Sequence, residues 1–183
     1  MGHSMATACL VLEELRKNGV THVVGLPDNS SARLFDLLTR DQGIQLLSVT
    51  REGEAFALAA GLWIGGKKPV VLIQNTGFTE SGDSFRGTIT RMRVPLVCLI
   101  TYRGYPKMMK WLGEVDKPTL DAESLSCPSL DSAALITEAT LKAWGLPFGY
   151  LHRNEDIPAL AEAFRSVEEN QQPFGILITQ DLT

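Results

Sequence analysis

The fold is decided by one stretch, Arg51-Glu52-Gly53-Glu54-Ala55-Phe56-Ala57-Leu58-Ala59-Ala60-Gly61, in which an arginine and two acids are followed by an almost wholly apolar run. It predicts a helix whose first turn carries Glu52 and Glu54, entered directly from a short strand over Leu46–Val49. Burying a carboxylate costs free energy unless something pairs with it, and the N–H groups at a helix N-terminus offset part of that cost. The segment therefore either presents an acid to an apolar site or carries two acids that favour a first helical turn and point to water.

Strand and helix patterns alternate on both sides of this helix. The expected strands are Thr21–Gly25, Gln45–Val49, Pro69–Gln74, Pro95–Thr101, Phe148–Leu151 and Phe174–Thr179. The expected helices are Met5–Lys17, Ser31–Thr39, Glu52–Ile64, Ser81–Arg91, Asp131–Trp144 and Asp156–Glu169. Strands joined by helices of this length form right-handed βαβ units. The sequence therefore predicts an α/β fold with three αβα layers, in which a mainly parallel sheet of about six strands has helices on both faces.

Ligands of such sheets bind beyond the carboxyl ends of the strands. That rule brings four segments to one edge: Leu26–Ser30, Thr50–Glu54, Gln74–Thr79 and Tyr102–Lys110. Within the third segment, Asn75-Thr76-Gly77 is expected to be a loop. The stretch Tyr102–Leu130 is expected to be irregular throughout, because three prolines and two glycines interrupt it, and a loop of that length is usually functional or mobile.

Composition excludes several classes of protein. The chain has 183 residues, 44% of them hydrophobic, which suits one domain over residues 1–183; residues 1–4 are interpreted as vector-derived. A formal charge of -4 and a pI near 5.4 argue against a nucleic-acid partner, and no apolar run is long enough to span a membrane. The three cysteines are far apart and predict reduced thiols in a cytoplasmic protein. The three histidines have no partner at metal-ligand spacing, so no metal site is expected in this chain.

Three segments together carry a family resemblance. They are Gly19-Val20-Thr21-His22-Val23-Val24-Gly25-Leu26-Pro27-Asp28, then Arg51-Glu52-Gly53-Glu54-Ala55 with Ala60-Gly61 downstream, then Val70–Gln74 with Asn75-Thr76-Gly77. In this order and spacing they resemble the pyrimidine-binding domain of thiamine-diphosphate enzymes. Gly-Leu-Pro-Asp, Gln-Asn-Thr-Gly and the later Arg103-Gly104 are most similar to the phosphonopyruvate and sulfopyruvate decarboxylases. The resemblance covers about residues 5–180.

The resemblance implies a catalytic role for Glu52, which would bind thiamine diphosphate by a hydrogen bond to its aminopyrimidine ring. Glu52, not Glu54, stands three residues before the first alanine of the helix and nine before Gly61, as the family glutamate does. Asp28 matches the Pro-Asp pair of the subgroup as a catalytic acid, whereas a gapless match to more distant decarboxylases places Asn29 there.

The resemblance also implies which other residues face the ligands. Cofactor contacts are implied for Pro27, Gln74, Asn75 and Thr76. Substrate contacts are implied for Asn29, Arg103 and Lys107, the last two as cations for an anionic 2-oxo acid. Arg51 departs from the subgroup, which commonly has a small polar residue there.

One departure from the family pattern determines which function we expect for this chain. The family binds Mg²⁺ and diphosphate through Gly-Asp-Gly and a downstream Asn, and nothing in this chain matches that pattern. The sequence therefore predicts an alpha-type subunit of a two-chain decarboxylase, whose partner subunit holds Mg²⁺ and the diphosphate. Self-association or partner binding is expected through Glu52–Ile64, because a helix that is apolar on all sides needs cover on all sides. The alternatives are a non-catalytic partner subunit that only stabilises another chain, and a flavodoxin-like module that binds a small ligand.

Overall fold

The computed structural model describes residues 6–114 and 120–183, so residues 1–4 lie outside the described part of the chain. The strands are β1 (His22–Gly25), β2 (Gln45–Ser48), β3 (Pro69–Gln74), β4 (Val97–Thr101), β5 (Phe148–Leu151) and β6 (Phe174–Ile178). The α-helices are α1 (Ala8–Lys17), α2 (Ala32–Thr39), α3 (Glu52–Ile64), α4 (Asn75–Glu80), α5 (Gly82–Ser84), α6 (Tyr105–Glu114), α7 (Ala122–Leu125), α8 (Ser132–Ala143) and α9 (Ile157–Asn170). A π-helical turn, η1 (Phe85–Thr90), and a 3-10 turn, η2 (Asn154–Asp156), complete the elements.

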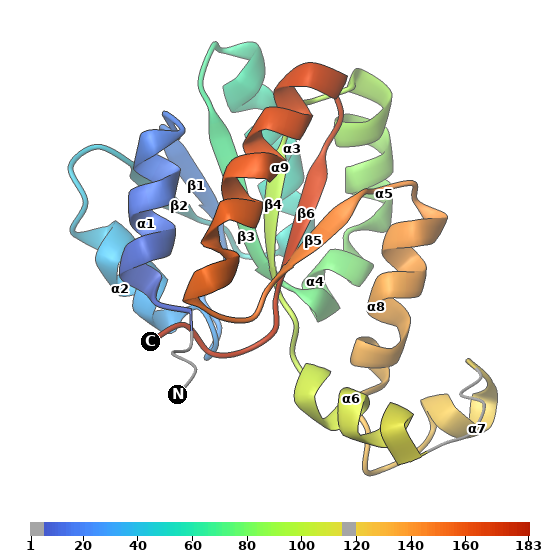
Figure 1. Ribbon diagram of the computed structural model, residues 1–183. Helices are drawn as coiled ribbons and strands as arrows, with labels where there is room; N and C mark the ends of the chain where they lie inside the picture. The colour runs from blue at the N-terminus through green and yellow to red at the C-terminus, as the bar shows by residue number, and fades with distance from the viewer. Residues whose placement is uncertain (1–5, 115–119) are drawn as a thin grey trace.

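The six strands form one parallel sheet in the order β2-β1-β3-β4-β6-β5, which confirms the predicted fold class. The central strands β3 and β4 are almost entirely buried because both faces of the sheet are covered. This double burial explains their continuous apolar sequence. All carboxyl ends lie at one edge of the sheet, at the bottom of Figure 1.

Helices cover the sheet in two layers with separate apolar cores (Figure 1). The first core joins α1, α2 and α9 to one face of the sheet. The second joins α3, η1 and α8 to the other face, and at its centre the rings of Phe56, Phe78 and Phe85 meet edge to face, with centroids 5.3–6.2 Å apart. Cys98 lies fully inside this second core.

The prediction that Tyr102–Leu130 is irregular was wrong, because α6 and α7 lie within it. Pro106 is the second residue of α6, where a missing N–H breaks no helical hydrogen bond, and Gly113 falls in the last turn. In α6, therefore, Pro106 and Gly113 lie at the two ends of a helix and do not interrupt it, whereas residues 115–119 of the predicted irregular stretch lie outside the described part of the chain.

Two shorter predictions also need correction. Asn75-Thr76-Gly77 is the first turn of α4 and not a loop. The helix expected at Ser81–Arg91 is divided into α5 and the π-helical turn η1, in which the backbone widens around the buried Phe85 and Ile89.

Helix α3 has the predicted bounds but only one covered face. Ala55, Phe56, Ala59 and Ala60 are buried, whereas the side chains of Leu58 and Ile64 are 41% and 66% exposed. The chain's own neighbouring elements therefore cover half of this apolar helix. Across the residues that the structure describes, no helix has the length and apolar character needed to cross a membrane.

Candidate active site

The Glu52 carboxylate lies on the backbone of the first turn of α4. α3 begins at Glu52 after β2, and α4 begins immediately after β3, so both N-termini meet at the carboxyl edge of the sheet. A Cβ placed on Gly77 would lie 2.1 Å from Glu52 Cγ and 2.2 Å from Cδ and Oε1. Only glycine leaves room for the carboxylate at this position. Gly77 is part of the Asn75-Thr76-Gly77 motif, but the sequence alone did not indicate this role.

The carboxylate of Glu52 remains available. Its side chain is half-buried, and within residues 6–114 and 120–183 it receives no hydrogen bond and forms no ion pair. A half-buried acid at two helix N-termini, with its oxygens uncommitted, can hydrogen-bond a ligand that reaches this edge.

Glu54 is used differently. Its Oε2 accepts hydrogen bonds from the Thr50 N–H and hydroxyl, both at 3.0 Å, and from the Arg51 N–H at 3.3 Å. These bonds cap the start of α3, and the Thr50 N–H is the main cause that lowers the pKa of Glu54 below its usual value. Arg51 itself pairs with Glu80 on the neighbouring helix.

The loop between β1 and α2 carries Pro27, Asp28 and Asn29. Both oxygens of Asp28 are engaged: Oδ1 accepts the Ser31 N–H at 2.9 Å, and Oδ2 accepts the hydroxyl of the fully buried Thr101 at the end of β4. Pro27 and Asn29 are exposed, and the Asn29 side chain makes no hydrogen bond to any described residue. In this loop, Asn29 therefore has the free polar side chain and Asp28 does not.

The last residue of β3, Gln74, and the first two residues of α4, Asn75 and Thr76, differ in burial. Gln74 and Thr76 are half-buried and bonded to each other, with the Thr76 hydroxyl donating to Gln74 Oε1 at 2.7 Å. Asn75 is fully buried, and its Nδ2 donates to the Arg103 carbonyl at 3.2 Å and to the Thr137 hydroxyl at 3.0 Å. Its Oδ1 is buried and has no hydrogen-bond partner among the described residues. Asn75 therefore fastens α4 to the end of β4 and to α8.

Arg103 and Lys107 line a polar groove of about 690 Å³ between the start of α6 and the start of α8. Arg103 forms an ion pair with Asp131, in which the aspartate Oδ2 lies 2.8 Å from the arginine Nε. Lys107 is exposed and, among the described residues, has no ion-pair partner. Gly104, at φ +83°, lets the chain turn against Asp131, where a Cβ would lie 2.7 Å from the aspartate Cβ.

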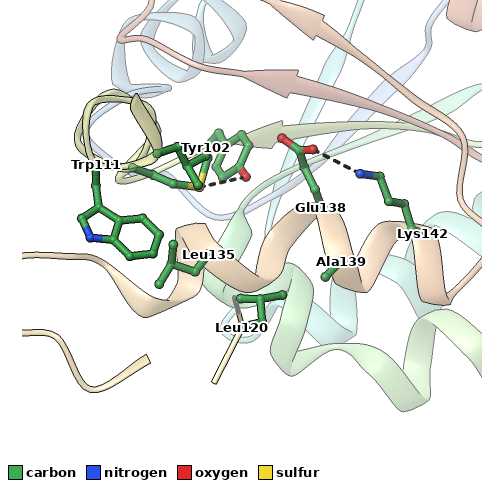
Figure 2. A pocket seen from close by; sticks show the side chains of 9 residues that line it. Tyr102, Trp111, Leu120, Leu135, Glu138, Ala139 and Lys142 are labelled. Carbon is green, nitrogen blue, oxygen red and sulfur yellow. Dashed lines mark hydrogen bonds and ion pairs between the residues drawn. The ribbon is translucent and has the colours of Figure 1, made fainter. Parts of the chain in front are cut away.

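A second, more apolar pocket of about 270 Å³ lies between α6 and α8, and sequence reasoning missed it (Figure 2). Figure 2 shows Trp111, Leu120 and Leu135 around it, with Glu138 beside Lys142. These two form an ion pair in which Lys142 Nζ lies 3.6 Å from Glu138 Oε2. Burial and the nearby Glu138 raise the pKa of Tyr102, so this tyrosine stays protonated. Glu138 has no neighbouring motif in the sequence that would have identified it.

The structure thus brings most of the predicted site residues to one edge of the sheet, but in separate surroundings. Glu52, Gln74 and Thr76 lie at the junction of α3 and α4. Asn75 connects that junction to the groove of Arg103 and Lys107 through the Arg103 carbonyl. Within the described residues, no group of three or more His, Cys, Asp or Glu side chains is arranged to hold a metal ion.

Comparisons with known proteins find similar sequences and a similar fold among decarboxylases. The chain is 35% identical over 114 residues to a phosphonopyruvate decarboxylase of Streptomyces hygroscopicus, covering 62% of this chain and 27% of that protein. It is 27% identical over 100 residues to the sulfopyruvate decarboxylase subunit alpha of Methanocaldococcus jannaschii, covering 55% and 59%. The crystal structure of benzoylformate decarboxylase from Polynucleobacter necessarius shares the fold, with a TM-score of 0.65 at 20% identity, over 96% of this chain and 30% of that one.

The chain therefore spans between about a quarter and three fifths of the length of these curated relatives. Residues 5–116, more than half of the chain, match the family model described as "Thiamine pyrophosphate enzyme, N-terminal TPP binding domain". The chain therefore belongs to the thiamine pyrophosphate enzyme family, of which it carries the N-terminal TPP binding domain.

Proposed function

We propose that this chain is the alpha-type subunit of a two-chain, thiamine-diphosphate-dependent 2-oxo acid decarboxylase. Its substrate would be an anionic 3-substituted pyruvate such as sulfopyruvate or phosphonopyruvate, the substrates named in its curated relatives. The observation that carries the proposal is the Glu52 carboxylate, which lies on Gly77 with its oxygens uncommitted among the described residues. This placement fits an acid that bonds the aminopyrimidine ring.

Thiamine diphosphate, when bound, supplies the electron sink that loss of carbon dioxide from a 2-oxo acid requires. Glu52 holds a proton at the pyrimidine ring nitrogen and orients the ring by that hydrogen bond. Gln74 and Thr76, at the end of β3 and the start of α4, and Pro27, in the loop after β1, would contact the cofactor beside Glu52. Asn75 acts through the position of α4, because its own side chain is buried behind it.

We assign substrate binding to the loop after β1 and to the start of α6. Asn29 presents a free amide, whereas a proton from Asp28 would have to come from a carboxylate already engaged by Ser31 and Thr101. We therefore assign Asn29 to the substrate and Asp28 to the shape of the loop, with Asp28 as the alternative acid. Lys107 is the better cation for the anionic group, because Arg103 already pairs with Asp131.

The partner subunit completes the site. It would carry Mg²⁺ and the diphosphate, for which this chain has no matching motif. The exposed apolar face of α3, with Leu58 and Ile64, begins nearly two turns after Glu52 and is the surface on which a partner or a second copy packs. Such an arrangement brings the cofactor to the junction between two chains.

The test is co-purification with a chain of similar length that carries Gly-Asp-Gly and a downstream Asn, encoded in the neighbouring reading frame. The assembly with thiamine diphosphate and Mg²⁺ should release carbon dioxide from sulfopyruvate or phosphonopyruvate. Glu52→Gln should lower kcat by about 10²–10⁴-fold, the usual cost of losing a placed proton-transfer group. Glu54→Gln is the matched control and should be much milder, because its amide oxygen still accepts the Thr50 bonds. The reverse ranking, or equal activity in Glu52→Gln and wild type, would reject the catalytic role.

A further inference from the structure

The loop between β1 and α2 is held on both sides of Asn29. Asp28 before it and Ser30 after it are each bonded to a different part of the sheet's carboxyl edge. Asn29 lies between them, exposed and with its own amide free among the described residues. Because both of its neighbours are fixed, the position of the Asn29 side chain is restricted even though its amide forms no hydrogen bond of its own within the described residues.

The first attachment runs to β4. The Thr101 hydroxyl, fully buried at the last residue of the strand, donates to Asp28 Oδ2. Asp28 Oδ1 accepts the Ser31 N–H at 2.9 Å, and the Asp28 N–H in turn donates to the Ser31 hydroxyl at 3.2 Å. Asp28 is therefore fixed both to the central strand and to the start of α2.

The second attachment runs to the segment after β6. The Ser30 hydroxyl donates to Asp181 Oδ1 at 2.6 Å, and the Ser30 carbonyl accepts the Leu182 N–H at 2.9 Å. The Leu182 side chain is buried in the core that joins α1 to the sheet. In Figure 1 this segment leaves β6 and crosses below the sheet to the C label near the start of α1.

We propose that Thr101 and Asp181 are positioning residues, which fix Asn29 in the place where it meets the substrate. The proposal rests on the proposed function and adds to it two residues with no assigned role. Neither side chain needs to touch the substrate, because each acts on a neighbour of Asn29. Holding a reacting group in place before binding contributes to rate, and a displacement of about 1 Å can cost about 10²-fold.

Asp181 gives the cleaner test. It is exposed, so its removal opens no cavity and leaves the core intact, whereas loss of the Thr101 hydroxyl leaves part of a carboxylate without its partner. In the assembled enzyme, Asp181→Ala should lower kcat by about 10- to 100-fold while KM changes by less than about twofold. Asp181→Asn keeps an oxygen that accepts the Ser30 hydroxyl and should retain at least about a third of kcat.

Two further variants separate positioning from general damage. Ser30→Ala combined with Asp181→Ala should be no worse than either change alone, because both remove the same bond. Glu168→Ala removes an exposed acid paired with Lys68 near the start of β3, at the opposite end of the sheet, and should leave kcat unchanged. Equal losses in Asp181→Ala and Asp181→Asn, or an Asp181→Ala enzyme within twofold of wild type, would overturn the proposal.

A second measurement is independent of turnover. Hydrogen exchange of the backbone amides in residues 28–31 of the full chain should be faster in Asp181→Ala and unchanged in Asp181→Asn. If the wild-type assembly releases no carbon dioxide, the proposed function fails and exchange alone decides whether Asp181 holds the loop. Unchanged exchange in Asp181→Ala would refute the positioning role whatever the activity.

Discussion

Replacing Gly77 by alanine directly tests the position of the Glu52 carboxylate. The added Cβ would lie 2.1 Å from Glu52 Cγ, and that contact must open to at least 3.4 Å to become ordinary, so the carboxylate has to move by about 1.3 Å. The clashing atoms are the outer part of a flexible side chain, so the backbone need not shift. A displacement above 1 Å at a proton-transfer group should lower kcat by about 10²-fold, or about 2.7 kcal/mol in activation free energy.

The same substitution should leave stability almost unchanged, because alanine is about 1 kcal/mol better than glycine within a helix and that gain offsets the rearrangement. The assay is steady-state carbon dioxide release by the assembly with its partner, together with the thermal midpoint Tm of the chain. Gly113→Ala is the matched control: it also lies in a helix, no described residue comes within 4 Å of its added Cβ, and it should keep full activity. A Gly77→Ala enzyme that keeps its Tm and more than about a third of its kcat would refute the placement of Glu52.

Three further predictions concern pH, cofactor binding and assembly. The pKa of Glu54 is lower in the folded chain than its ordinary value of 4.5, so the ionised carboxylate stabilises the fold above pH 4.5 and this stabilisation is lost as the pH falls through the lowered pKa. The free energy of unfolding, followed by circular dichroism in acid, should therefore fall less steeply with decreasing pH in Glu54→Gln than in wild type. Calorimetry on this chain alone should detect weak or no binding of thiamine diphosphate, and micromolar, Mg²⁺-dependent binding would contradict a site divided between two chains. Leu58→Glu places a charge on the exposed face of α3 and should shift the sedimenting species toward the 20.0 kDa monomer. Wild-type chain that is monomeric at high concentration, and fails to bind the partner, would exclude that face as an interface.

Local patterns were sufficient for most of the sheet. The bounds of β3 and β5 and of α3 were predicted as observed, because each is a short apolar run between clear turn signals. The helix α6 was missed because proline and glycine were interpreted as breaks, although each occupies a position at a helix end where it is tolerated. Residue type alone does not say whether a proline begins a helix or prevents one.

Less of the site than of the fold could be predicted from the sequence. The choice of Glu52 over Glu54 rested on spacing, and the capping bonds of Glu54 give a physical reason for the difference. The burial of Asn75 depends on Arg103 and Thr137, which are 28 and 62 residues away, so no local pattern indicates it. The same holds for Asp28, whose partner Thr101 is 73 residues away.

The position of β6 has a consequence for how the chain folds as it is made. β6 lies between β4 and β5, and among the described strands β5 pairs with β6 alone. β5 is therefore synthesised before its neighbour exists, and both β4 and β5 leave the ribosome with an open edge for on the order of seconds. Unpaired strand edges are the surfaces on which chains aggregate. Slower elongation between residues 151 and 174 should therefore reduce the soluble yield of this protein.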